Sequence, residues 1–127
     1  MCALTNYDDL VDAAQQESVA VIISGAGLPL KLPSLIKNNT TKLVPIVSSA
    51  RAAKLIFSTW QRRYQRLPDA VVVEGPLAGG HLGYSLAELG DPEHCFLDHI
   101  LSEVIAVAAE FACAGTTIPV IAAGGIF

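Results

Sequence analysis

The sequence predicts an α/β fold made of parallel β/α units, and three observations support this prediction. Four short apolar runs rich in β-branched residues are predicted strands, at residues 19–23, 42–47, 70–73 and 120–122. The first three strands begin about one strand–helix unit apart. Loops rich in glycine or serine follow the strands directly, as they do at the carboxyl edge of parallel sheets, where binding sites form. The run at 19–23 is continuous, which predicts a strand buried on both faces.

The segments between the strands are predicted to be helical. Residues 5–8 suit a helix start, because Thr5 or Asn6 can cap free N–H groups and the acidic residues that follow favour the positive helix end. Gly115 is a stop signal for the last helix. The other predicted helices cover residues 33–37, about 50–66 and about 97–114.

Two architectures fit this order of elements. Repeated strand–loop–helix units mean a parallel sheet with crossover helices. Four such strands could form an open doubly wound sheet, or a sector of an eight-stranded barrel that normally takes about 200 residues or more. The pattern alone does not decide between them.

Composition limits the class of protein. The chain has 127 residues, which we interpret as a single domain over residues 1–127. The net charge is −4, without the basic bias of a protein that binds nucleic acid or an anionic membrane. Hydrophobic residues make up 52% and charged residues 16%. Either the sheet is buried on both faces, or some apolar surface meets something absent from this chain.

The cysteines and the first residues indicate a compartment. Cys2, Cys95 and Cys113 are an odd, scattered set without a CxxC pair, so a reducing environment fits best. Residues 1–9 lack the pattern of a signal peptide, and the longest apolar runs fall short of the roughly 20 residues of a membrane helix. A cytoplasmic protein without a membrane span is therefore expected.

The loop after the third strand carries the first candidate site. Glu74 stands at the strand end, and Gly79-Gly80-His81 follows, with Gly83 behind it. Glycines let the backbone approach a flat or phosphorylated ligand, and an imidazole can exchange protons near neutral pH. The alternative is a flexible loop with a surface histidine.

A second motif ends the fourth strand. Residues 118–126 are a predicted buried strand that runs into Gly124-Gly125. In a barrel, such a loop presents backbone N–H groups to a phosphate. By itself this motif has moderate specificity, because several phosphate-binding barrels share it.

Together, and in this order, the two motifs resemble the nitronate monooxygenase (2-nitropropane dioxygenase) family, of which enoyl-acyl carrier protein reductase II is a close relative. Residues 24–29 and 42–49 resemble loops after consecutive barrel strands in that family, so the resemblance spans nearly the whole chain. It implies an FMN-binding TIM barrel of the oxidoreductase class. Because this chain is short, we expect part of a barrel, about strands four to seven.

The resemblance also implies roles for particular residues. His81 matches the catalytic histidine, and Glu74 stands where many members carry a glutamine near the flavin ring. The implied flavin contacts are Glu74, Gly79, Gly80, Gly124 and Gly125. No metal site is implied.

Three functions follow as hypotheses. The first is oxidation of alkyl nitronates by O₂ to a carbonyl compound and nitrite, in which His81 removes the proton α to the nitro group or stabilises the nitronate anion. The second is FMN-dependent reduction of an enoyl thioester by NAD(P)H. The third is a non-catalytic barrel fragment that self-associates through sheet edges beside residues 19–23 and 120–122. We expect FMN binding by this chain alone to be weak or absent.

Other patterns are weaker. His94, Cys95, Asp98 and His99 could form two one-turn pairs of metal ligands, but a solvated helix start is the commoner explanation. The loop that begins at Gly25 fails the dinucleotide fingerprint, because its third glycine is absent. A small-molecule substrate is thus the partner that the sequence favours.

Overall fold

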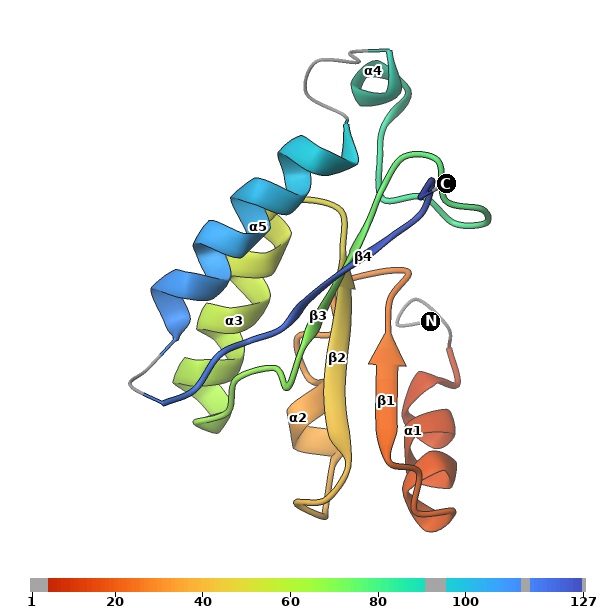
Figure 1. The fold of residues 1–127 in the computed structure, drawn as a ribbon. Coiled ribbons are helices and arrows are strands. Elements are labelled where there is room, and N and C mark those ends of the chain that lie inside the picture. Colours follow the sequence, from red (N-terminus) through yellow and green to blue (C-terminus); the bar gives the residue numbers. More distant parts are fainter. Residues whose placement is uncertain (1–4, 91–95, 113–114, 127) are drawn as a thin grey trace.

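The fold is a parallel four-stranded sheet flanked by helices (Figure 1). A computed structural model describes residues 5–90, 96–112 and 115–126. The strands are β1 (Val21–Ser24), β2 (Lys42–Val47), β3 (Val71–Glu74) and β4 (Val120–Ala123). All three pairings are parallel, and the strands follow one another in chain order. The prediction of about four parallel strands with flanking helices is confirmed.

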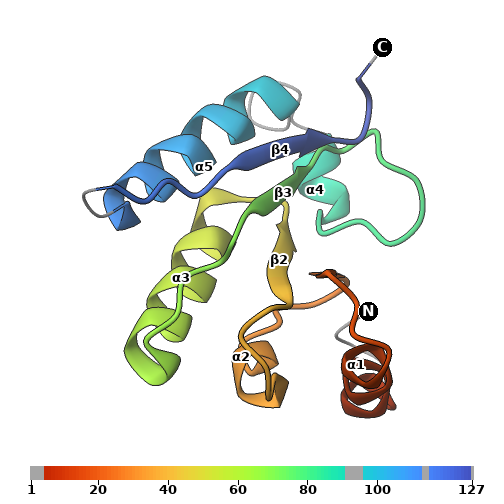
Figure 2. The ribbon, with the colours of Figure 1, turned by 60° about the horizontal axis from the view of Figure 1, so that its bottom comes forward.

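The placement of the helices decides between the two predicted architectures. The helices are α1 (Tyr7–Gln16), α2 (Leu32–Leu35), α3 (Ala50–Tyr64), α4 (Leu86–Leu89) and α5 (Leu97–Phe111). In Figure 2, α1, α2, α3 and α5 form an arc around one side of the curved sheet. A doubly wound sheet would reverse its strand order and carry helices on both faces. Chain order with helices on one side is the arrangement of a barrel sector.

The helix ends show which of the predicted capping residues make capping hydrogen bonds. Ser49 caps α3, because its hydroxyl accepts a hydrogen bond from the Ala52 N–H at 3.3 Å. Asn6 occupies the same position before α1 but makes no side-chain capping bond, so the predicted cap does not form there. Gly115 adopts a φ of +91°, a left-handed conformation that suits glycine, after α5 has ended at Phe111.

The short helix α4 was not among the predicted elements. It begins with a capping box, in which Ser85 and Glu88 exchange hydrogen bonds between side chain and backbone. A serine three residues before a glutamate is the sequence signal that could have indicated it. All residues of α4 are exposed, so packing contributes little to this helix.

The core lies between the sheet and the helices. Leu43, Val71 and Val73 of the sheet are fully buried against side chains of α3 and α5. Phe57 of α3 meets Phe111 of α5 edge to face, with ring centroids 5.6 Å apart. The buried core residues of the two helices are Ala53, Ile56, Phe57, Trp60, Ile100, Val104, Val107 and Ala108. The core therefore forms on one face of the sheet.

The opposite, inner face of the sheet is partly open, so the prediction that the first strand is buried on both faces is wrong. Ile22 packs against the core, whereas its neighbours Val21 and Ile23 are 46% and 58% exposed. Ile121 of β4 is 47% exposed. In a complete barrel, inward side chains pack against those of strands across the barrel. Four neighbouring strands form only an arc, so the side chains at its two ends lack such neighbours among the described residues.

A carboxylate holds the amino-terminal end of the sheet together. Asp69, just before β3, accepts hydrogen bonds from the Leu43 N–H at 2.9 Å, from Lys42 at 2.9 Å and from Arg66 at 3.0 Å. Burial raises the pKa of Asp69, but these hydrogen bonds outweigh it and hold the pKa below its usual value. Arg66 also donates to the Thr41 carbonyl at 2.9 Å. Asp69 thus joins β2, the end of α3 and β3.

The Asp69→Asn variant should be less stable by about 1–2 kcal/mol near neutral pH, because charge-assisted hydrogen bonds are lost. The loss is no larger because the exposed Lys42 is screened by solvent. The folded-state pKa of Asp69 is lowered, so its stabilisation is present above the unfolded-state pKa of about 3.9 and disappears as pH falls through the folded-state pKa. Urea unfolding at about pH 7 and about pH 3 should show the variant and wild type converging in acid. Asp12→Asn, which removes an exposed pair with Lys37, is the matched control and should change stability little. A pH-independent difference would contradict the assignment.

Across residues 5–90, 96–112 and 115–126, none of the helices has both the length and the apolar character needed to cross a membrane.

Candidate active site at the carboxyl edge of the sheet

A pocket of about 170 Å³ lies where three consecutive strands end. Its walls come from the loop after β1, from the junction of β2 with α3, and from the loop after β3. In chain order the lining residues are Ala26, Gly27, Leu28, Ile46, Ser48, Ser49, Ala52, Glu74, His81, Leu82 and Gly83. This is the edge of a parallel sheet at which loops build binding sites.

Two glycines let the neighbouring loops approach β2 closely. A Cβ on Gly25 would lie 2.8 Å from Cδ1 of Ile46, and a Cβ on Gly83 would lie 2.6 Å from Oγ of Ser48. A side chain at either position would require the loop, or the facing side chain of Ile46 or Ser48, to shift. These contacts bring the first and third loops together over the end of β2.

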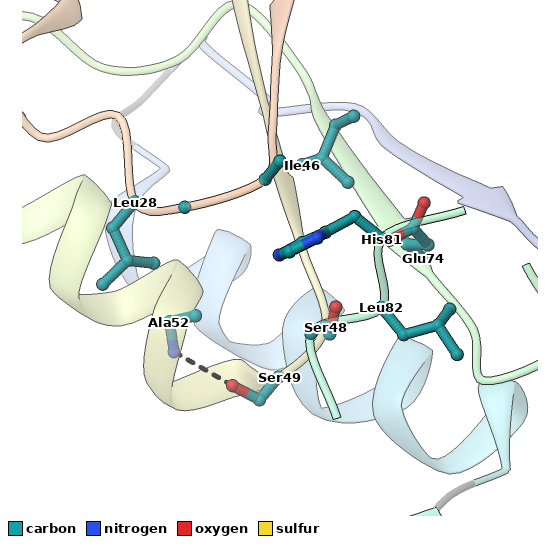
Figure 3. A pocket seen from close by; sticks show the side chains of 11 residues that line it. Leu28, Ile46, Ser48, Ser49, Ala52, Glu74, His81 and Leu82 are labelled. Carbon is teal, nitrogen blue, oxygen red and sulfur yellow. Dashed lines mark hydrogen bonds between the residues drawn. The ribbon is translucent and has the colours of Figure 1, made fainter. Parts of the chain in front are cut away.

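The imidazole of His81 lies in this pocket. Figure 3 shows it pointing away from its own loop, between the side chains of Ile46 and Ser48. His81 is exposed, so a ligand in the pocket can reach the ring. Glu74, the last residue of β3, is half-buried and lines the same pocket. The structure thus brings together two of the residues singled out in the sequence.

Gly79 and Gly80 lie at the exposed tip of the loop and do not line the pocket. Gly80 has a φ of +90°, a conformation that favours glycine. A Cβ on either residue would meet no atom within 4 Å. The space beside their backbone is open, and their contact with a flavin stays a prediction.

Gly124 and Gly125 pack against the loop after β3, outside the pocket. A Cβ on Gly124 would lie 2.7 Å from the Ala78 Cβ, and one on Gly125 would lie 2.6 Å from the Leu77 Cβ. Both glycines have positive φ values, +84° and +86°. Their absent side chains therefore let the loops after β3 and β4 lie side by side. Their contact with a phosphate stays a prediction.

Several pocket residues had no role in the sequence-based site. Leu28, Ile46 and Leu82 line the pocket with apolar side chains from three different segments, here called the apolar wall, and Ser48 adds a hydroxyl. The pair of serines directly after a predicted strand was a signal for Ser48. The three apolar residues resemble ordinary core residues in sequence, so only the fold reveals their position.

Among the residues that the structure describes, the fold brings no further metal ligand to the possible metal site around Asp98 and His99. His94 and Cys95 lie outside the described residues. Asp98 and His99 are on α5, where His99 lies 3.5 Å from Glu103. In the part of the chain that the structure describes, no group of three potential ligands lies close enough to hold a metal ion.

The residues of the pocket fit one part of a flavin or of a small substrate. The apolar wall and the polar groups of Ser48, Glu74 and His81 together suit a flat ring with a polar edge. The volume of about 170 Å³ is below the roughly 300–1,000 Å³ of pockets that enclose drug-sized ligands. The pocket therefore cannot enclose a whole FMN molecule.

Comparison with known proteins identifies the family. The model of the nitronate monooxygenase family matches residues 2–127. Among solved structures, the chain is similar to a FabK mutant from Thermotoga maritima, with 31% identity and a TM-score of 0.70 over 98% of this chain and 34% of that one. No curated protein sequence matches significantly.

A second solved structure supports the fold. A nitroalkane oxidase from Streptomyces ansochromogenes matches with 24% identity and a TM-score of 0.68, over 94% of this chain and 31% of that one. The chain thus spans about a third of the length of both structures. Because the family model covers nearly every residue, this chain belongs to the nitronate monooxygenase family of oxidoreductase enzymes, and its four strands are part of an α/β barrel.

Proposed function

We propose that the protein is an FMN-dependent oxidoreductase that converts alkyl nitronates and O₂ to a carbonyl compound and nitrite. The observation that carries this proposal is the His81 imidazole, which points into a pocket formed by three consecutive strand ends. Family membership supports the reaction class. A base beside an apolar wall suits a neutral nitroalkane, which has an alkyl part and an acidic C–H bond and becomes the nitronate when it loses that proton.

The pocket residues have separate tasks in this reaction. His81 removes the proton α to the nitro group, so the C–H bond breaks and the negative charge moves to the nitro oxygens, or it stabilises that anion. Leu28, Ile46 and Leu82 contact the alkyl group and exclude water. Ser48 offers a hydroxyl donor to a nitro oxygen. Bound FMN supplies the redox chemistry of the oxidation.

The cofactor contacts extend beyond the pocket. We assign the flavin ring to the neighbourhood of Glu74 and of the open backbone at Gly79 and Gly80, and the phosphate to the loop of Gly124 and Gly125. Since the pocket encloses only part of such a molecule, the 127-residue chain alone should bind FMN weakly. After desalting, it should retain far less than one equivalent, measured by flavin absorbance. Stoichiometric retention would contradict this expectation.

The proposed activity is tested with saturating FMN. Uptake of O₂ and formation of nitrite should depend on an alkyl nitronate. Oxidation of NAD(P)H that depends on an enoyl thioester, without nitronate activity, would instead support the second candidate. That candidate is enoyl-thioester reduction, in which His81 assists protonation of the product, and the same glycine motifs favour it because they also resemble enoyl-acyl carrier protein reductase II.

The third candidate is a non-catalytic domain, residues 1–127, that self-associates. The exposed apolar side chains of Val21, Ile23 and Ile121 on the inner face favour it, because two copies could cover each other's apolar surface. The mass in solution, measured by light scattering on the sample used for the flavin spectrum, separates a monomer from a dimer.

A further inference from the structure

We infer that Tyr84 is a positioning residue for His81. Its hydroxyl fastens the end of the histidine loop to the end of β3, and this bond keeps the imidazole in the pocket. The inference rests on the proposed function for its catalytic consequence, but the position of the His81 side chain can be measured without any activity.

The His81 loop is held on both sides of its tip but not at the tip itself. On the first side, the Ala78 N–H donates to the Gly75 carbonyl at 3.2 Å, and Ala78 packs against Gly124. At the tip, space beside Gly79 and Gly80 is open out to 4 Å. Two adjacent glycines leave the backbone with many accessible conformations, so the position of His81 depends on what holds the loop behind it.

Tyr84 provides the second attachment. Its hydroxyl donates a hydrogen bond of 2.6 Å to the backbone carbonyl of Glu74. Its ring is half-buried and packs against the hydrophobic core. One residue earlier, Gly83 lies directly against Ser48. The chain is therefore anchored two to three residues after His81, at a strand end that itself lines the pocket.

This bond closes the loop at its base. Glu74 and Tyr84 are ten positions apart, and the hydrogen bond joins the two ends of the loop that contains His81. Without it, the loop could move off β3 and Ser48, and the imidazole would sample positions outside the pocket. A base must be held within a fraction of an ångström of its productive position, so such freedom lowers turnover.

The kinetic test uses Tyr84→Phe, which removes the hydroxyl and keeps the ring. We expect kcat to fall by about tenfold, the upper range for one lost hydrogen bond. In a His81→Asn background, the same substitution should cause no further fall, because the residue that it positions is already gone. Tyr64→Phe makes the same chemical change in the last residue of α3, at the far end of the sheet, and should leave kcat unchanged.

The structural test uses NMR on the flavin-free protein. The side-chain signal of His81 should shift and sharpen in Tyr84→Phe, and that of His99 on α5 should not change. An unchanged His81 signal overturns the inference, and so does an equal fall in kcat with and without His81. If His81→Asn keeps full activity, the proposed function fails instead, and the His81 signal still decides whether Tyr84 positions the loop.

Discussion

Replacing His81 with Asn should lower kcat for a neutral nitroalkane by about 10²–10⁴-fold, the usual contribution of a positioned acid–base group. Asn keeps a polar side chain of similar size but cannot accept the proton. The imidazole suits this step because it points into the pocket at the end of β2, beside the apolar wall where an alkyl group would bind. Steady-state O₂ uptake with saturating FMN measures the loss.

The substrate form separates the two roles that His81 can have. A preformed nitronate has already lost its α proton, so a base becomes unnecessary, whereas stabilisation of an anion does not. If His81 acts as the base, its loss should affect the nitroalkane far more than the nitronate. An equal loss for both substrates indicates anion stabilisation. His99→Asn, on the exposed surface of α5, is the control. Unchanged turnover of both substrates by His81→Asn would rule out both roles of His81.

Replacing Trp60 with Ala should lower the free energy of unfolding by about 3–5 kcal/mol, the range for removing a large aromatic side chain from a core. Trp60, on the inner side of α3, is fully buried in the core. Its indole N–H also donates to the Pro29 carbonyl at 3.0 Å. Because Pro29 follows the pocket residue Leu28, the substitution should loosen the pocket wall as well. Urea unfolding measures the first effect.

A second variant separates packing from hydrogen bonding at this position. Trp60→Phe keeps an aromatic ring but removes the indole donor, while the Pro29 carbonyl still accepts from the Leu32 N–H at 3.2 Å. The lost hydrogen bond should cost about 0.5–1.5 kcal/mol, well below the loss for Trp60→Ala. Leu55→Ala, on the partly exposed side of the same helix, is the control and should cost much less. Equal losses for Trp60→Ala and Leu55→Ala would show that the core does not depend on Trp60.

Much of the fold could be predicted because local signals and packing agree. The β-branched runs became β2 and β3 with their helix-facing side chains buried, and the serine pair after β2 became the start of α3. The exposed side of β1 could not be predicted. A continuous apolar run looks the same whether both faces are covered or only one, since burial depends on what lies across the barrel.

The site divides in the same way. The sequence by itself determined that parallel strands end in glycine-rich loops, that His81 belongs to one of them, and that the motifs are those of the nitronate monooxygenase family, because strand runs, glycines and their order are local features. Only the tertiary structure decided that His81 and Glu74 share a pocket with Leu28 and Ser48, while Gly124 packs outside it. It also placed the Tyr84 hydroxyl on the end of β3. The physical reason is that these contacts join residues from different strands and loops, and their distances depend on how the sheet curves.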